Sequence, residues 1–118
     1  MIVQIISIKY RKVNTQNVTD MGCMFKGCES LKNLNLSNFN TQNVIYMNGL
    51  FYECKLLNEV NLSNFNTQNV TDMRCMFKGC ESLVNINLSN FNIQNVSNMN
   101  GMFYGCNSLI KKNIITMN

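Results

Sequence analysis

The chain has 118 residues, with ten lysines and arginines, six aspartates and glutamates, and no histidine, proline or tryptophan. This length allows one domain at most, and the apolar fraction of 46% argues against an intrinsically disordered chain. The net charge of +4 does not indicate a nucleic-acid partner, because residues 14–110 carry only five basic side chains against six acidic ones.

Residues 1–13 form an atypical leader. Its apolar run has no basic region before it, is too short to cross a membrane and precedes no small-residue cleavage site. These features favour a cytosolic protein or an excised piece of a longer one, without a membrane span. A shift of 26 residues aligns Ile5 with Leu31 and Tyr10 with Leu36. The leader is therefore predicted to be a degenerate N-terminal half-repeat, because a terminal repeat has one uncovered face.

Residues 14–118 form a repeat domain built on a 26-residue unit, as in NTQNVTDMRCMFKGCESLVNINLSNF. The four copies span 14–39, 40–65, 66–91 and 92–117. A period of this length indicates a solenoid, in which each copy is one coil that buries its apolar face against the next. The first and third copies are nearly identical, and the second and fourth share MNG and FY. This alternation indicates duplication of a two-coil unit.

Each copy contains the pattern L-x-x-L-x-L, as at Leu31, Leu34 and Leu36. Alternation of apolar and polar residues predicts a half-buried strand, and strands from successive copies should pair in parallel. The polar residues between the apolar ones would then form columns on the exposed face of the sheet. These columns are the predicted binding residues: Asn33, Asn35, Glu59, Asn61, Asn85, Asn87, Lys111 and Asn113.

The stretch VTDMRCMFKGC predicts a short helix, because Met73, Met76, Phe77 and Cys80 follow the spacing i, i+3, i+4, i+7. Asp72 stands at the expected N-cap. Asp20 and Asn98 occupy the same position in the first and fourth copies. The second copy has Tyr46 there, which is not a capping residue. Residues Gly27, Gly79 and Gly105, with Glu53 in the second copy, stand where a left-handed residue usually ends a helix. One phenylalanine per copy should stack inside: Phe25, Phe51, Phe77 and Phe103.

The predicted fold is therefore an α/β, right-handed, leucine-rich-repeat-type solenoid. A parallel β-sheet forms one face, and short helices and turns form the other. Asparagine, serine and threonine in the segment SNFNTQNV are expected to bond to nearby backbone in tight turns.

Six cysteines raise the question of disulfides or metal. Four share one repeat position (Cys28, Cys54, Cys80 and Cys106), where parallel side chains favour small buried thiols over disulfides. Cys23 and Cys75 add a C-x₄-C spacing that zinc could use. The other two copies have Gly49 and Gly101 at that position, so we expect no metal site.

The residue types also argue against catalysis. Without histidine, the chain lacks the most common general base and the usual partner of a serine or cysteine nucleophile. Asp20 and Asp72 could be paired catalytic carboxylates, but helix capping explains their recurrence. The sequence also contains no glycine-rich phosphate loop. We therefore expect no catalytic residues and no cofactor.

The elements L-x-x-L-x-L-S-N-F, N-T-x-N-V-T-D-M and M-F-x-G-C closely resemble the BspA-like leucine-rich-repeat family of surface proteins, over residues 14–110 and faintly over 5–13. The resemblance implies a solenoid on a secreted or lipid-anchored protein that serves adhesion and host or matrix contact. Members often carry aspartate in the turn after the phenylalanine. This chain has asparagine there, so no cation site is carried over: Asn14, Asn40, Asn66 and Asn92.

Two classes of function remain open. The leading one is a non-enzymatic binding module for a protein or glycan partner, acting through the sheet face in protein–protein interaction or surface adhesion. The alternative is a structural fragment of a longer repeat protein, used for spacing or self-assembly, or an intracellular interaction protein. End-to-end self-association is also expected. Both ends carry basic clusters, which repel each other. Salt screens this repulsion and should therefore promote the association. The clusters are Lys9, Arg11 and Lys12 at one end, and Lys111 and Lys112 at the other.

Overall fold

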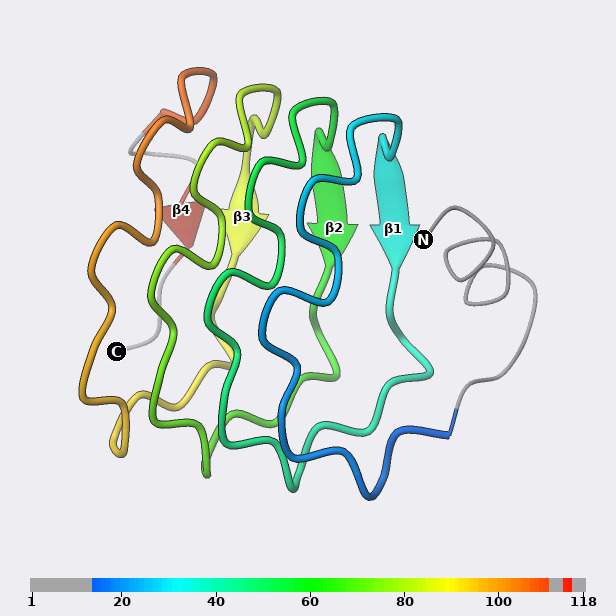
Figure 1. Ribbon diagram of the computed structural model, residues 1–118, viewed down its shortest axis with the longest axis vertical. Helices are drawn as coiled ribbons and strands as arrows, with labels where there is room; N and C mark the ends of the chain where they lie inside the picture. Colours follow the sequence, from blue (N-terminus) through cyan, green and yellow to red (C-terminus); the bar gives the residue numbers. More distant parts are fainter. Residues whose placement is uncertain (1–13, 111–113, 116–118) are drawn as a thin grey trace.

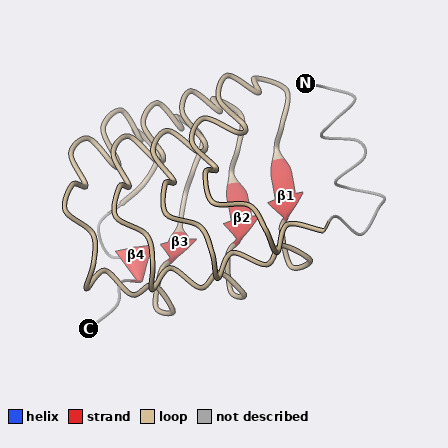
Figure 2. Cartoon of the chain, turned by 60° about the horizontal axis from the view of Figure 1, so that its bottom comes forward, coloured by secondary structure: helices blue, strands red, loops and turns tan. Residues whose placement is uncertain are grey.

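The computed structural model describes residues 14–110 and 114–115, which wind into coils lying side by side (Figure 1). Each coil contributes one short strand, and turns make up the rest (Figure 2). The strands are β1 (Asn33–Asn35), β2 (Glu59–Asn61), β3 (Ile86–Asn87) and β4 (Ile114–Ile115).

The strands pair in parallel, as the alternating pattern predicts, but they form two two-stranded sheets, β1 with β2 and β3 with β4, and not one continuous sheet across the described coils. β1 pairs with β2, with Asn33 opposite Glu59 and Asn35 opposite Asn61. Leu34 is buried between the exposed Asn33 and Asn35, so the strand has one face in the core and one in solvent. This part of the prediction is confirmed.

The last strand departs from the 26-residue step. β3 pairs with β4 so that Ile86 lies opposite Ile114, whereas a 26-residue step would place Lys112 there. A shift of two residues in a strand keeps the same face inward. The shift therefore replaces a lysine by an isoleucine at the inward position, at the point where the fourth copy loses the leucine pattern.

The predicted short helices are wrong, because the described residues contain no helix. The N–H of Lys26 donates to the carbonyl oxygen of Cys23 (3.1 Å), which closes a tight turn, while the N–H of Phe25 donates to Leu50 in the next coil (3.0 Å). A helix would direct every such N–H to the carbonyl four residues back. Here alternate N–H groups leave the coil and join it to its neighbour.

The predicted left-handed position is confirmed even though no helix ends there. Gly79 has φ 78° and Glu53 has φ 59°. A second left-handed position was not predicted, and there Cys23 (φ 59°) and Cys75 (φ 55°) alternate with Gly49 and Gly101. A Cβ on Gly49 would lie 3.0 Å from the Cys23 sulfur, so glycine in one coil leaves room for the thiol of the preceding coil.

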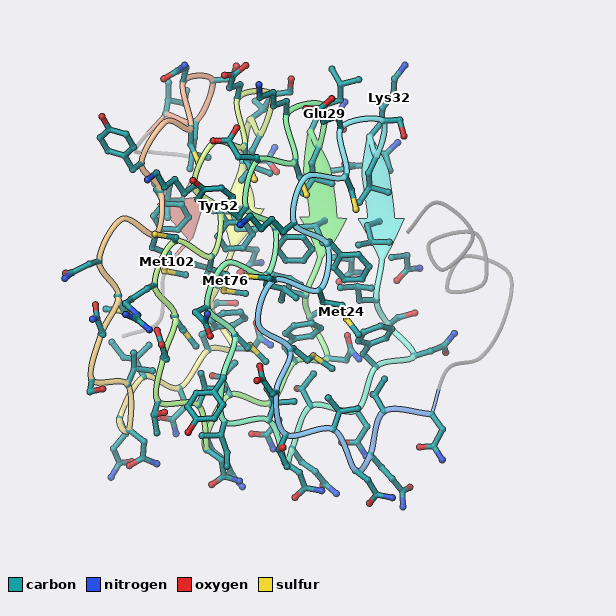
Figure 3. All side chains as sticks on the ribbon, in the orientation of Figure 1. Met24, Glu29, Lys32, Tyr52, Met76 and Met102 are labelled. Carbon is teal, nitrogen blue, oxygen red and sulfur yellow. The ribbon has the colours of Figure 1, made fainter. Side chains whose placement is uncertain are left out.

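The aromatic column is confirmed. Phe25 and Phe51 stack with ring centroids 5.6 Å apart, Phe51 and Phe77 at 5.3 Å, and Phe77 and Phe103 at 5.6 Å. All are buried except Phe103, which is half-buried in the last coil. A second row crosses the coils beside it, formed by Met24, Leu50, Met76 and Met102, of which the methionines are labelled in Figure 3. These two columns hold the core together from coil to coil.

Polar side chains join the coils as well. The buried hydroxyl of Thr67 donates to the carbonyl oxygen of Asn92 (2.9 Å) and accepts from the N–H of Asn92 (2.7 Å). The amide nitrogen of Asn90 donates to the carbonyl oxygens of Leu62 (3.0 Å) and Phe65 (2.8 Å) in the preceding coil. Some of the asparagine and threonine side chains therefore bond across coils, whereas the sequence predicts bonds within the tight turns.

Candidate functional site

A hollow of about 670 Å³ lies along the strand side of the coils. Its lining residues come from the first three coils: Leu31, Asn33, Leu34, Asn35, Ser37, Asn38, Glu59, Val60, Asn61, Asn85, Ile86 and Asn87. Six of the eight predicted binding residues are therefore brought together around one concave surface. The other two, Lys111 and Asn113, lie outside the described residues.

The column formed by Asn35, Asn61 and Asn87 presents hydrogen-bond donors. Within each coil one carboxamide oxygen accepts the N–H of the serine two residues on, as in Asn35 to Ser37 (2.9 Å) and Asn61 to Ser63 (3.0 Å). The same bond fixes Asn87 (2.9 Å). With the oxygen held, the NH₂ groups of these three side chains have no partner among residues 14–110 and 114–115. The structure therefore offers a row of orientated amide donors.

Glu59 is the only acidic residue in the lining. It lies opposite Asn33 in the parallel pair and is exposed. A carboxylate beside amide donors can accept hydrogen bonds from hydroxyl or N–H groups of a ligand. The hollow thus contains both donors and one strong acceptor.

A second hollow of about 530 Å³ lies on another side of the coils and was not predicted. It is lined by Asn17, Thr19, Asn43, Ile45, Asn69 and Thr71. The signal that could have indicated it is the same alternation, because these residues flank the valine of the segment QNV in each coil. Here the amide nitrogen of Asn43 donates to the carbonyl oxygen of Gln16 (2.6 Å), so the asparagines serve coil stacking.

An alternating column of lysine and tyrosine runs along the turn side, and it too was missed from the sequence. The Lys26 nitrogen lies 5.0 Å from the centre of the Tyr52 ring, and the Lys78 nitrogen lies 5.6 Å from Tyr52 and 5.5 Å from Tyr104. Figure 3 labels Tyr52. These distances suit cation–π contact, which holds the ammonium groups in a row.

The carboxylates expected to cap helices close turns instead. Asp20 accepts the N–H of Gly22 (2.7 Å), and Asp72 accepts the N–H of Arg74 (3.0 Å). The Arg74 guanidinium also bonds to Asp72 (2.7 Å), and this bond holds the pKa of the Asp72 carboxyl below its usual range. Each carboxylate is therefore engaged locally in its own coil.

The cysteine ladder is buried, as expected. The thiol of Cys54 donates to the carbonyl oxygen of Phe25 (3.1 Å), Cys80 to Phe51 (3.1 Å) and Cys106 to Phe77 (3.0 Å). Burial raises the pKa of Cys54 to about 12 and that of Cys106 to about 11. All six cysteines lie in the described part of the chain, and none is in a disulfide. Within that part, no three potential ligands converge on a metal position.

We expect the thiols to differ strongly in reactivity. In the unfolded protein, titration with a thiol reagent should find six free thiols. In the native protein at neutral pH, the exposed Cys23 should react first. Cys54 and Cys106 should react at least about 100-fold more slowly, because the reagent needs a thiolate and their raised pKa keeps them protonated. Two or fewer thiols in the unfolded protein would contradict this prediction and indicate disulfides.

Comparison with known proteins places the chain in a family. Residues 3–116 match the family model described as "Mycoplasma protein of unknown function, DUF285". No curated protein and no solved structure shows significant similarity to the chain. Nor does the described part of the chain contain a helix long and apolar enough to cross a membrane. Because the match covers nearly the whole sequence, the chain belongs to the DUF285 family.

Proposed function

We propose that the chain is a non-enzymatic binding module that holds a protein or glycan partner against its strand side. The observation that carries the proposal is the convergence of Asn33, Asn35, Glu59, Asn61, Asn85 and Asn87, from three separate coils, around one hollow. The proposal includes the finer fold assignment, a right-handed leucine-rich-repeat-type solenoid of the BspA-like class. The stacked coils and the parallel strands support that assignment.

The chemistry of the hollow suits a polar, uncharged ligand. The free NH₂ groups of Asn35, Asn61 and Asn87 can donate to the hydroxyl oxygens of a sugar or the carbonyl oxygens of a peptide. Because a backbone bond fixes each carboxamide, little conformational entropy is lost when it binds. Spacing the donors one strand apart would match an extended ligand lying across the coils.

The proposed setting is the cell surface, with a role in adhesion. The support is the resemblance of the repeats to surface proteins of the BspA-like family. An intracellular interaction protein would use the same strand side, so the identity of the ligand decides between the two settings.

The test is direct binding of the 118-residue chain to a glycan array and to a panel of immobilised matrix proteins. Glu59→Arg and Asn85→Arg place bulky cations in the hollow at exposed positions. Each should weaken the binding of any probe that the wild type retains by at least about tenfold. Gln68→Arg is the matched control, because Gln68 is exposed in the same coil as Asn85 but does not line the hollow.

Equal loss in all three variants would point to a general effect of positive charge and not to this site. Unchanged binding by Glu59→Arg and Asn85→Arg would remove the strand side as the binding surface. If the wild type binds no probe on either panel, the binding-module proposal fails and the structural alternative is favoured.

A further inference from the structure

Within the described part of the chain, the hydrogen-bond ladder that joins the coils ends in unpaired donors at the fourth coil. In each of the first three coils, four backbone N–H groups donate to carbonyl oxygens of the next coil. In the third coil the bonds run from Met73 to Asn98, Cys75 to Asn100, Phe77 to Met102 and Gly79 to Tyr104, at 2.8–3.0 Å. The equivalent N–H groups of the fourth coil have no acceptor among residues 14–110 and 114–115: Met99, Gly101, Phe103 and Gly105.

The first coil ends in the complementary acceptors. In the second coil, the carbonyl oxygens of Tyr46, Asn48, Leu50 and Tyr52 receive the N–H groups of the first coil. The equivalent carbonyls of the first coil receive no hydrogen bond from any described residue: Asp20, Gly22, Met24 and Lys26. One end of the molecule thus presents four donors, and the other presents four acceptors in the same repeat positions.

Two further pairs of groups match, with the donors on the first coil and the acceptors on the fourth. Between inner coils, the N–H of Ser97 donates to the carbonyl of Thr71 (2.9 Å), and the amide nitrogen of Asn95 donates to Gln68 (2.6 Å). At the ends, the N–H of Thr19 and the side-chain amide of Asn17 are unpaired donors within the described residues. The carbonyls of Ser97 and Gln94 are the corresponding unpaired acceptors.

The side chains of the two ends also match. Two types of coil alternate along the chain, so the first and fourth coils are of different types, as neighbouring coils are. The first coil (14–39) differs from the third (66–91) at only three positions: Gly22 for Arg74, Lys32 for Val84, and Leu34 for Ile86. A first coil placed on the fourth coil would therefore present almost the surface that the third coil presents to the second. Tyr104 would meet a lysine as Tyr52 meets Lys78, at 5.6 Å.

Within the described residues, the turn half of the fourth coil is open at its end and carries no charged side chain. Met99 is 42% exposed, whereas its equivalents Met47 and Met73 are fully covered by the next coil. Phe103 is half-buried, and residues 92–110 contain no charged side chain. Exposed apolar groups beside unpaired backbone donors are typical of an edge that pairs with another chain.

We propose that a second copy of this chain stacks its first coil on the fourth coil, in a head-to-tail assembly that leaves both of its ends free to grow. The pairing concerns the turn half of each coil, residues 95–105 of one copy with 17–27 of the next. Because the two surfaces differ, the contact is heterologous and does not close at a dimer.

The test measures the mass of the 118-residue chain by sedimentation over a wide concentration range, at about 0.15 M and about 1 M salt. The average mass should keep rising with concentration past that of a dimer. Met99→Glu should lower the association constant at least about tenfold, because stacking would bury its carboxylate without a partner. Leu56→Glu is the matched control, because Leu56 is equally exposed but lies in an inner coil.

A mixing experiment tests the polarity of the contact. The Met99→Glu chain keeps an intact first coil, so it should add to the fourth coil of the wild type and stop further growth at that end. An equimolar mixture should therefore have an average mass below the mean of the two chains measured separately at the same concentrations, whereas chains that do not interact would give that mean. The unfolding curve of Met99→Glu should match that of Leu56→Glu, which shows that the fold is retained.

Three outcomes would overturn the proposal. The first is a monomer at every concentration and both salt levels. The second is a mass that stops at a dimer, which would indicate a symmetric contact. The third is association that Met99→Glu and Leu56→Glu weaken equally, which would place the contact away from the fourth coil.

Discussion

Replacing Phe77 by alanine is expected to lower the free energy of unfolding by about 3–5 kcal/mol, the range for fully buried aromatic side chains. Phe77 has no exposed surface and lies between the rings of Phe51 and Phe103, at 5.3 and 5.6 Å. Its removal would leave a cavity in the middle of the column. The backbone ladder on both sides would prevent the coils from closing over that cavity, because the N–H of Phe77 is bonded to Met102 (2.9 Å).

Denaturant unfolding at equilibrium measures this loss. Phe103→Ala is the matched control, because the same ring at the end of the column is half-buried and has a described neighbour on one side only. We expect it to cost about half as much, since less apolar surface is removed from the core. A loss below about 1 kcal/mol for Phe77→Ala would show that the aromatic column contributes little to the core.

Replacing Thr67 by valine should cost about 2–3 kcal/mol, although the shape of the side chain is preserved. The Thr67 hydroxyl is buried and forms two bonds to the backbone of Asn92 in the next coil, at 2.9 and 2.7 Å. Valine would leave both the N–H and the carbonyl oxygen of Asn92 without that partner. Leaving such partly buried groups unpaired costs more than the net value of the bonds themselves.

Thr71→Val is the internal comparison for this effect. The Thr71 hydroxyl makes a longer bond to Ile45 (3.4 Å) and is half-buried, so its loss should cost less than about 1 kcal/mol. Thr67→Ser should retain most of the stability, because serine keeps the hydroxyl. Equal unfolding free energies for the two valine variants would show that the hydroxyl of Thr67 does not stabilise the coil junction.

Features that depend only on which residues recur at which position could be predicted from the repeat. The period predicted the stacking of Phe25, Phe51 and Phe77, because residues one coil apart must lie over one another. The alternation around Leu34 predicted a strand with one buried face. Gly79 marked a left-handed position, because glycine adopts positive φ at little cost.

The arrangement of the strand-side hollow was predicted in part. The alternation was sufficient to place Asn35, Asn61 and Asn87 in one exposed column. It did not show that the carboxamide oxygens are bonded to the serine N–H groups while the NH₂ groups stay free. That choice depends on the conformation of the turn after each strand, which the alternation does not specify.

The acceptors of the backbone N–H groups in the turn segments could not be predicted from the sequence, because they lie in the neighbouring coil. The spacing of Met73, Met76, Phe77 and Cys80 places apolar side chains on one side of a helix, but two consecutive tight turns bury the same residues. The N–H of Phe77 bonds to Met102 and not within its own segment. The neighbouring coil lies at hydrogen-bonding distance and supplies that acceptor. An acceptor in the same coil and one in the next coil compete for each N–H, and the pattern of a single segment does not show which of them is bonded.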